Sequence, residues 1–121
     1  MKWEFSDDRP IYTQIVEQMT LFIVSGELAP GDKVMPVREL ASEAGVNPNT
    51  MQRALSELER MGLMSTNRTS GRYITEDVGI IQSAKLEIAR KSISEFLSNM
   101  QKIGCDRKAA IKMLESMDEG S

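Results

Sequence analysis

The sequence predicts a mainly helical fold with one small β-hairpin. Apolar residues recur at helical spacing on both sides of a single pair of short extended runs. Glycine, proline, asparagine and aspartate stand at the ends of these segments, where helix stops and caps are expected. The length of 121 residues allows one small domain with an appendage and is too short for a two-lobed enzyme.

The first helix is expected to begin at Pro10 and to end near Gly26. Proline suits the first helical position because the N–H of that residue would be unpaired in any helix. Glycine is a common stop just past the end of a helix. The expected core face has residues at i, i+3 and i+4 spacing, namely Ile11, Ile15, Met19, Phe22 and Ile23.

Two further helices joined by a tight turn are expected from about Pro36 to Ala44 and over residues 48–61. Gly45 ends the first of them, and Asn47 caps the second with Pro48 at its first position. The inward face of the second of these helices is expected to hold Met51, Ala54, Leu55, Leu58 and Met61.

A β-hairpin is expected next. Two extended runs, residues 63–67 and 72–75, are joined by a polar turn that contains Gly71. Three helices followed by a two-stranded hairpin is the order of a winged helix–turn–helix, in which the third helix enters the major groove of DNA and the second crosses the backbone.

A two-helix tail is expected after the hairpin. Helical spacing resumes from Ile80 to about Lys102, Gly104 breaks it, and Asp106 can cap a last short helix. We expect residues 119–121 to fray. The chain is therefore expected to divide into a winged helix–turn–helix DNA-binding domain over 1–76 and a C-terminal dimerisation segment over 77–121.

An apolar stripe along the tail needs a partner. Either it packs back on its own winged domain or, as we prefer, it packs on the same helices of a second subunit and forms a two-fold homodimer. The tail is too short to enclose a metabolite pocket with its own core, and no residue set identifies a small-molecule effector. The stripe consists of Ile81, Ala84, Ile88, Ile93, Phe96, Leu97, Met100 and Ile103.

The composition argues against catalysis. The chain has no histidine, which removes the commonest general base and metal ligand, and its single cysteine allows no internal disulfide and no Cys-x-x-Cys site. We expect no enzyme activity, no metal and no cofactor. Cys105 is interpreted as a partly buried small residue, with redox sensing as the alternative. The free thiol, the absence of a signal sequence and the lack of a membrane-spanning run favour a cytoplasmic protein.

The charge distribution favours DNA binding once the chain is divided. The net charge of −3 argues against a nucleic-acid partner. However, residues 32–74 carry six basic and five acidic side chains, and the stretches 47–53 and 68–72 contain no acid. Their donor-rich side chains suit phosphate oxygens and base edges. Amide groups at the start of the third helix could also receive a phosphate.

Other interpretations of these residues remain open at this point. Asn47 and Thr50 could be ordinary capping or surface residues, and Arg53 could form a surface ion pair with Glu57. A protein-interaction module that uses the winged fold and the tail as docking surfaces is the alternative function. Scattered positions of Arg53, Arg68 and Arg72 would favour that alternative.

Several motifs occur in the order and at the spacing seen in the GntR family of bacterial transcription regulators, and the sequence resembles that family and within it the short YtrA-like branch. The resemblance covers residues 10–75, and the two expected C-terminal helices also look like the tail of that branch. The matching stretches are Pro10–Ile15, Gly26–Lys33, Val37–Ala41, Gly45–Thr50, Arg53–Leu55, and Leu58–Glu59 leading to Gly62–Leu63.

The resemblance implies a sequence-specific regulator that binds a double-stranded, palindromic operator as a homodimer. It further implies repression, of an operon encoding an ABC transporter. In the family, an arginine of the second helix contacts DNA, the start of the third helix reads bases, and a wing glycine reaches the minor groove or its flanking phosphates. The positions indicated here are Arg38, Asn47, Pro48, Asn49, Thr50, Gln52, Arg53, Arg68, Gly71 and Arg72.

Two departures from the family pattern are visible. Pro36 stands where the family has a serine cap, which removes a capping hydrogen bond of about 1 kcal/mol. The wing, usually Gly-x-Gly-Thr, has Thr69 in place of its first glycine and Arg72 after the second. We therefore expect the contacts of this wing to differ in detail from those of the family.

Overall fold

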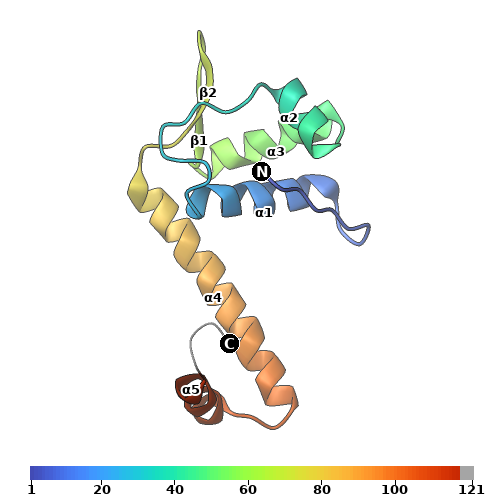
Figure 1. Cartoon of the computed structure of the whole chain (residues 1–121). Helices are drawn as coiled ribbons and strands as arrows, with labels where there is room; N and C mark the ends of the chain where they lie inside the picture. Colours follow the sequence, from blue (N-terminus) through green and yellow to red (C-terminus); the bar gives the residue numbers. More distant parts are fainter. Residues whose placement is uncertain (118–121) are drawn as a thin grey trace. The chain divides into compact units, whose positions relative to one another are not determined.

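The computed structural model describes residues 1–117 and confirms a mainly helical chain with one hairpin (Figure 1). The expected frayed end at 119–121 lies outside the described residues. The chain forms two compact units, Met1–Lys85 and Leu86–Ser121, so the division falls inside the fourth helix. The elements are α1 (Ile11–Val24), α2 (Val37–Ala44), α3 (Pro48–Arg60), β1 (Met64–Asn67), β2 (Gly71–Ile74), α4 (Val78–Lys102) and α5 (Arg107–Ser116).

The turn between α2 and α3 has the geometry that the sequence predicts. Gly45 adopts φ 74° and ψ 34°, a left-handed conformation that glycine reaches without a steric penalty. The N–H of Val46 then donates to the carbonyl of Ala41 at 3.0 Å, which satisfies one of the last carbonyls of α2. Asn47 caps α3 and Pro48 is its first residue, as expected. A tight helix–turn–helix is the result.

Two helix starts differ by one residue from the prediction. Pro10 and Pro36 precede α1 and α2 as cap residues rather than opening them, with extended ψ values of 138° and 147°. Their carbonyls accept the first helical hydrogen bonds, from Gln14 at 3.4 Å and from Leu40 at 2.9 Å. Neither proline offers a side-chain cap, so both helices begin without the hydrogen bond that a serine or aspartate would supply.

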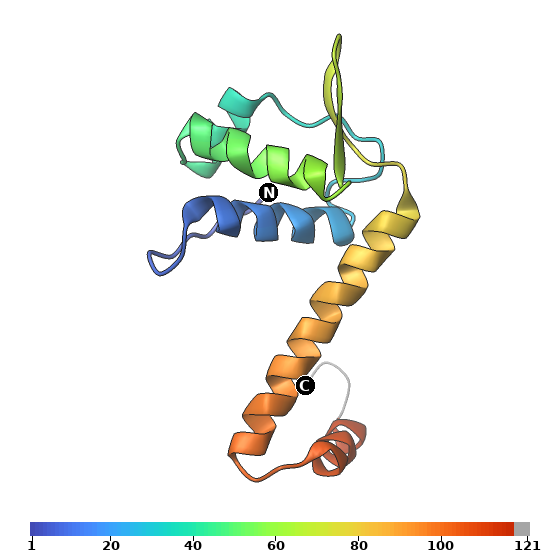
Figure 2. The same ribbon diagram turned by 180° about the vertical axis from the view of Figure 1, so that it is seen from behind.

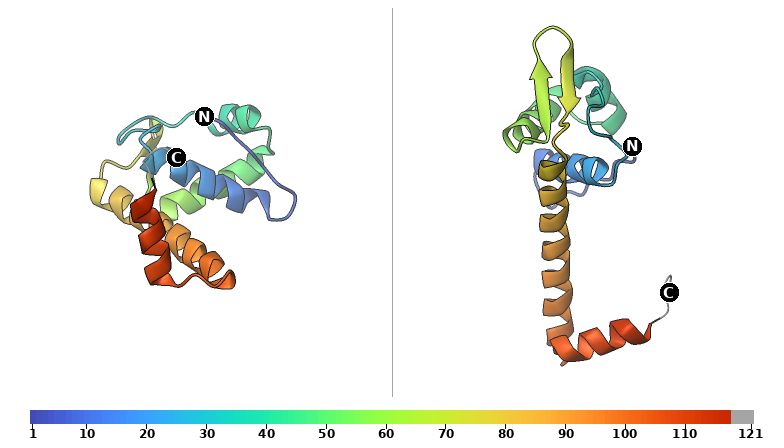
Figure 3. Two further views of the ribbon diagram at one scale, coloured as in Figure 1. Left: turned by 60° about the horizontal axis from the view of Figure 1, so that its bottom comes forward. Right: turned by 90° about the vertical axis from the view of Figure 1, so that its left-hand side faces the viewer.

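The hairpin forms one antiparallel ribbon, with Met64 opposite Ile74 and Asn67 opposite Gly71 (Figure 3). The loop after α1 pairs with β2, the second strand of the hairpin. The N–H of Val34 donates to the carbonyl of Arg72 at 2.8 Å, and the N–H of Ile74 donates to Asp32 at the same distance. This loop therefore covers one edge of β2, which protects the edge from further pairing.

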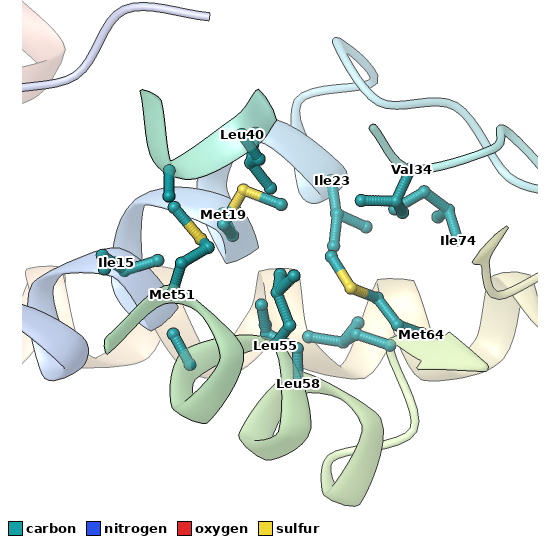
Figure 4. Packing of buried hydrophobic residues seen from close by; sticks show 13 residues of the cluster. Ile15, Met19, Ile23, Val34, Leu40, Met51, Leu55, Leu58, Met64 and Ile74 are labelled. Carbon is teal, nitrogen blue, oxygen red and sulfur yellow. The ribbon is translucent and has the colours of Figure 1, made fainter. Parts of the chain in front are cut away.

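The core of the first unit lies between α1 and α3, which run side by side in both views (Figures 1 and 2). Met19 and Leu55 are fully buried and meet there with residues from α2 and the hairpin (Figure 4). Met61 was expected in this core but is 38% exposed, because α3 ends at Arg60 and Met61 lies in its C-cap. The labelled core residues are Ile15, Met19, Ile23, Val34, Leu40, Met51, Leu55, Leu58, Met64 and Ile74.

The start of α4 belongs to the same unit. Asp77 caps it, because its Oδ1 accepts from the N–H of Gly79 at 2.9 Å and from that of Ile80 at 3.3 Å. Ile80, Ile81 and Ala84 pack against the core. The expected dimer stripe therefore divides: Ile81 and Ala84 have a partner within their own chain.

The second unit contains the rest of α4 and α5. Asp106 caps α5 as predicted, accepting from the N–H of Ala109 at 2.9 Å, and Ala110 is buried. Cys105 is half-buried in the connection. Several large apolar side chains of this unit are exposed, namely Leu86, Ile93, Phe96, Ile103, Ile111, Met113, Leu114 and Met117.

Candidate nucleic-acid interface

The outward side of α3 carries the expected donor-rich residues. Asn49, Gln52 and Arg53 are exposed, while the opposite side of the helix is buried in the core. Gln52 donates from Nε2 to the hydroxyl of Ser56 at 3.2 Å, which holds two polar side chains in line along the helix. No acid occurs between Gly45 and Ser56, so this surface lacks like charges that would repel phosphate.

The first turn of α3 is partly satisfied within the chain. Asn47 Oδ1 accepts from the N–H of Asn49 at 2.7 Å, so this backbone donor is already occupied. Asn47 and Pro48 are exposed, and Thr50 is half-buried. The cap thus uses the side-chain oxygen of Asn47. The N–H groups of the same side-chain amide are available to a ligand.

Arg53 has a different partner from the one considered in the sequence. Its guanidinium carbon lies 3.7 Å from the centre of the Tyr12 ring on α1. Glu57 is instead bound by Arg60, whose Nε donates to Oε2 at 2.9 Å, and this hydrogen bond lowers the pKa of the Glu57 carboxyl. The surface ion pair between Arg53 and Glu57 is therefore not formed.

The wing turn presents one free arginine. Asn67 Oδ1 accepts from the N–H of Thr69 at 3.0 Å and from its hydroxyl at 2.8 Å, which shapes the turn, and Arg68 is exposed beside it. Gly71 follows with φ 112°, a value that L side chains rarely adopt. A Cβ built on Gly71 would lie 3.5 Å from Cε of Lys33.

Lys33 is thereby placed next to the wing, and sequence reasoning did not assign it to the site. The residue forms an isolated β-bridge with Tyr73 in β2. Its position depends on the pairing of a loop with a strand some forty residues later, which no local pattern reveals. A basic residue in a loop directly before the helix–turn–helix was the only available signal.

Arg72 lies at the root of the wing and is bound within the chain. Its Nε donates to Glu59 Oε1 at 2.6 Å, and its side chain is only 16% exposed. Burial raises the pKa of the Glu59 carboxyl, but hydrogen bonds from Thr66 and Arg72 outweigh this effect and leave the pKa below its ordinary value. This arrangement ties the hairpin to the last turns of α3.

Four cations of residues 32–74 form no ion pair with a carboxylate. Within residues 1–117 the ion pairs involve Arg9, Arg60, Arg72 and the N-terminal amine, so none is formed by the other arginines of the helix–turn–helix and wing. The free cations are Lys33, Arg38, Arg53 and Arg68, all of them exposed.

Two arginines mark the borders of the outward side of α3. Six residues separate Arg53 from Glu59, which puts them about 120° apart around the helix, with Asn49 and Ser56 between them. Arg53 therefore borders the outward side of α3 beside α1, and Arg72 borders it beside the hairpin. The bond between Arg72 and Glu59 thereby holds the root of the hairpin against α3.

No cluster of three or more histidine, cysteine, aspartate or glutamate side chains suited to a metal ion occurs in residues 1–117. None of the helices there combines the length and the hydrophobicity that crossing a bilayer requires.

Comparison with known sequences identifies the family. Residues 11–74 match the family described as "Bacterial regulatory proteins, gntR family". The chain is 37% identical over 117 residues to the uncharacterized HTH-type transcriptional regulator YhcF of Bacillus subtilis, covering 97% of both chains. It is 36% identical over 98 residues to the HTH-type transcriptional repressor YtrA of the same organism, covering 80% of this chain and 75% of that one.

Comparison with solved structures agrees. A GntR family transcriptional regulator from Listeria monocytogenes superimposes with a TM-score of 0.85 at 39% identity, over 94% of this chain and all of that one. The DNA-binding domain of AraR in complex with operator ORR3 has a TM-score of 0.53 at 27% identity, over 62% of this chain and 88% of that one. With an exposed α3, a wing and free cations around them, the chain belongs to the GntR family and is a DNA-binding transcriptional regulator of the winged helix–turn–helix type.

Proposed function

We propose that the chain is a repressor that binds a palindromic operator as a homodimer in the cytoplasm. The observation that carries this proposal is the acid-free outward side of α3, with Asn49, Gln52 and Arg53 exposed at its start. Side chains of these types form the base-edge contacts known for recognition helices, with arginine to guanine and asparagine or glutamine to adenine.

Each part of the interface has a distinct proposed role. The exposed side chains at the start of α3 read bases in the major groove, and Arg38 on α2 contacts the backbone beside it. The wing tip approaches the minor groove or its phosphates. Lys33 joins this set, whereas Arg72 positions the wing through Glu59. The proposed DNA-contacting residues are Lys33, Arg38, Asn47, Pro48, Asn49, Thr50, Gln52, Arg53, Arg68 and Gly71.

The proposed dimer surface is a seam along α4. Six residues follow one another at intervals of three and four, the spacing of the a and d positions in a coiled coil. Five of its six side chains are exposed, Ile93 by 56% and Ile103 by 73%, and Met100 is half-buried, so most of this seam has no cover within residues 1–117. The seam comprises Leu86, Ala89, Ile93, Phe96, Met100 and Ile103.

This seam revises the stripe expected from the sequence. Leu86 and Ala89 join it, while Ile81 and Ala84 leave it because they pack on their own core. Ile88 and Leu97 are half-buried and face another side of α4. A second copy is the proposed partner because a two-fold seam would present two α3 helices to half-sites about 34 Å apart.

Dimerisation also compensates for weak electrostatic attraction. With a net charge of −3, the chain has little non-specific affinity for DNA, and salt screens what it has. Linking two binding units makes the second contact intramolecular and raises the overall affinity. Occupancy of the operator then blocks polymerase without any catalytic step. The relative named as the repressor YtrA supports repression, and an operon encoding an ABC transporter is the proposed target.

The test is a fluorescence-anisotropy titration with a duplex selected from a random pool. Wild-type protein should bind the selected duplex more tightly than random duplex, and its affinity should fall steeply with salt. Arg38→Ala should weaken binding to both duplexes, because a phosphate contact carries no sequence information. Equal affinity for selected and random duplex would contradict specific recognition.

A further inference from the structure

Tyr12 lies directly under Arg53, on a helix outside the helix–turn–helix pair. The guanidinium carbon of Arg53 is 3.7 Å from the centre of the Tyr12 ring. At this distance the cation lies against the face of the ring, where the negative quadrupole attracts it. Stacking occupies only the face of the guanidinium, so the N–H donors in its plane remain available to a ligand.

The neighbouring carboxylates do not compete for Arg53. Glu17 and Glu57 line the groove beside it. Glu17 accepts from Nη1 of Arg9 at 2.6 and 2.5 Å, and Glu57 accepts from Nε of Arg60 at 2.9 Å. Each carboxylate thus has an arginine of its own. Within residues 1–117, Arg53 has an aromatic partner and no acidic one.

The surroundings of this stack are open. A second groove, of about 480 Å³, lies on another side of Arg53, between the start of α1 and the first turns of α3. It is lined by Pro10, Ile11, Asn49 and Thr50 as well as by the stacked pair. The edge of the guanidinium is therefore accessible at the end of α3 that carries the base-reading residues.

We propose that Tyr12 is a positioning residue for DNA recognition, which holds the Arg53 guanidinium in one plane with its donors ready for oxygen or nitrogen acceptors on the duplex. This inference rests on the proposed function. A free arginine side chain loses conformational freedom when it binds, and a stacked one has lost part of that freedom beforehand. Tyr12 would therefore contribute to affinity without touching DNA.

A double-mutant cycle tests this role. Tyr12→Leu in the wild-type background should weaken binding to the selected duplex by about two- to five-fold, the effect expected of an exposed cation–π contact. In the Arg53→Ala background the same change should have no further effect. Tyr12→Phe should restore wild-type affinity, because the ring and not the hydroxyl forms the stack. Melting temperatures identify variants whose fold is damaged.

The same titrations identify the acceptor. If Arg53 contacts a base, Arg53→Ala and Tyr12→Leu should weaken the preference at one base pair; if it contacts a phosphate, Arg53→Ala should lower the salt slope by about one. Side-chain NMR gives a second measurement on wild-type protein. The Arg53 Nε–H signal should be shifted upfield by the ring. Its relaxation should show that the Arg53 side chain is less mobile than that of Arg38.

Three results would overturn the inference. One is an equal loss from Tyr12→Leu in both backgrounds, which would mean that the ring only packs α1 against α3. Another is unchanged affinity in Tyr12→Leu or in Arg53→Ala, and the third is an unshifted, freely moving Arg53 signal. Failure of the proposed function is distinguishable, because wild-type protein would then show no preference for the selected duplex.

Discussion

Nε of Arg72 in β2 donates to Oε1 of Glu59 in α3 at 2.6 Å, and this bond connects the wing to α3, the proposed recognition helix. Glu59 also accepts from the hydroxyl of Thr66 in β1, so one carboxylate holds both strands. A small hairpin with four residues in each strand has little stability of its own. The position of the wing therefore depends in part on Glu59, beside the pairing of β2 with the loop after α1.

Replacement of Glu59 by glutamine should loosen the wing. We expect the free energy of unfolding to fall by about 1 kcal/mol. The effect is moderate because the Arg72–Glu59 pair is partly exposed and because glutamine can still accept a weaker, uncharged hydrogen bond. Such a loss lowers the melting temperature of a domain of this size by about 4–8 °C. Hydrogen exchange should rise in the hairpin and not in α1. Unchanged exchange in the hairpin would show that other contacts hold the wing.

The pH dependence of stability should reveal the same carboxylate. The folded pKa of Glu59 lies below its ordinary value of 4.5, so its stabilising contribution is present above that value and is lost as the pH falls through the lower folded pKa. Wild-type protein should accordingly lose stability below about pH 4.5 more steeply than Glu59→Gln, as measured by thermal melts across the acid range. Parallel acid profiles for the two proteins would contradict this assignment.

The two wing arginines should have separable effects. Arg68→Ala should weaken DNA binding and lower the salt slope by about one without changing the melting temperature, because Arg68 is exposed and unpaired within residues 1–117. Arg72→Ala should lower the melting temperature, because it leaves Glu59 without its partner. Anisotropy titrations at several salt concentrations and thermal melts measure both. A stable Arg72→Ala protein would count against the structural role of that residue.

The α4 seam should control the oligomeric state. Ile93→Glu and Phe96→Glu each place a charge in the seam, so they should dissociate the dimer and weaken operator binding together. Lys91→Glu is the matched control, since it introduces the same side chain outside the seam and should leave the dimer intact. Sedimentation velocity at micromolar concentration measures the effect. A wild-type monomer at that concentration would rule out the seam as a dimer surface.

The N-terminal segment, residues 1–9, should detach from α1 when the Gln14 side chain is replaced by alanine. This buried amide donates to the carbonyls of Ser6 at 2.8 Å and of Arg9 at 2.9 Å, and accepts from the N–H of Ser6 at 2.9 Å. Gln14→Ala should cost about 2–3 kcal/mol, because it removes three part-buried hydrogen bonds between the N-terminal segment and α1. Fluorescence of Trp3, the one tryptophan of the chain, should shift to the red as its ring leaves Phe22. Exposed Gln82→Ala should change neither property.

The sequence predicted the fold well where local signals decide it. The turn at Gly45 and the caps at Asn47 and Asp106 depend on residue types with a specific backbone or side-chain role, and each is confirmed. The misplaced boundaries occur where the signal is ambiguous. Proline suits both the N-cap and the first helical position. The predicted first helix therefore begins at Pro10, one residue before the observed start of α1 at Ile11.

The site could be predicted only where residues lie close in sequence. The polar start of α3 is a local pattern, and its exposure follows from helical spacing. The roles of Tyr12, Lys33 and Arg72 depend on partners in distant segments, and no periodicity encodes which charged groups will pair. For the same reason the tail stripe was expected to be one surface, whereas Ile81 packs on the core and Ile93 is exposed.

Selection of bound sequences from a random duplex pool, with the full chain as bait, shows whether the protein reads DNA as a dimer. A homodimer should enrich two inverted half-sites whose centres are about one helical turn apart, roughly 10 base pairs. Ile93→Glu protein in the same selection should enrich single half-sites weakly or none. No enriched sequence, or one asymmetric site bound by wild-type protein, would contradict a dimeric regulator that reads a palindromic operator.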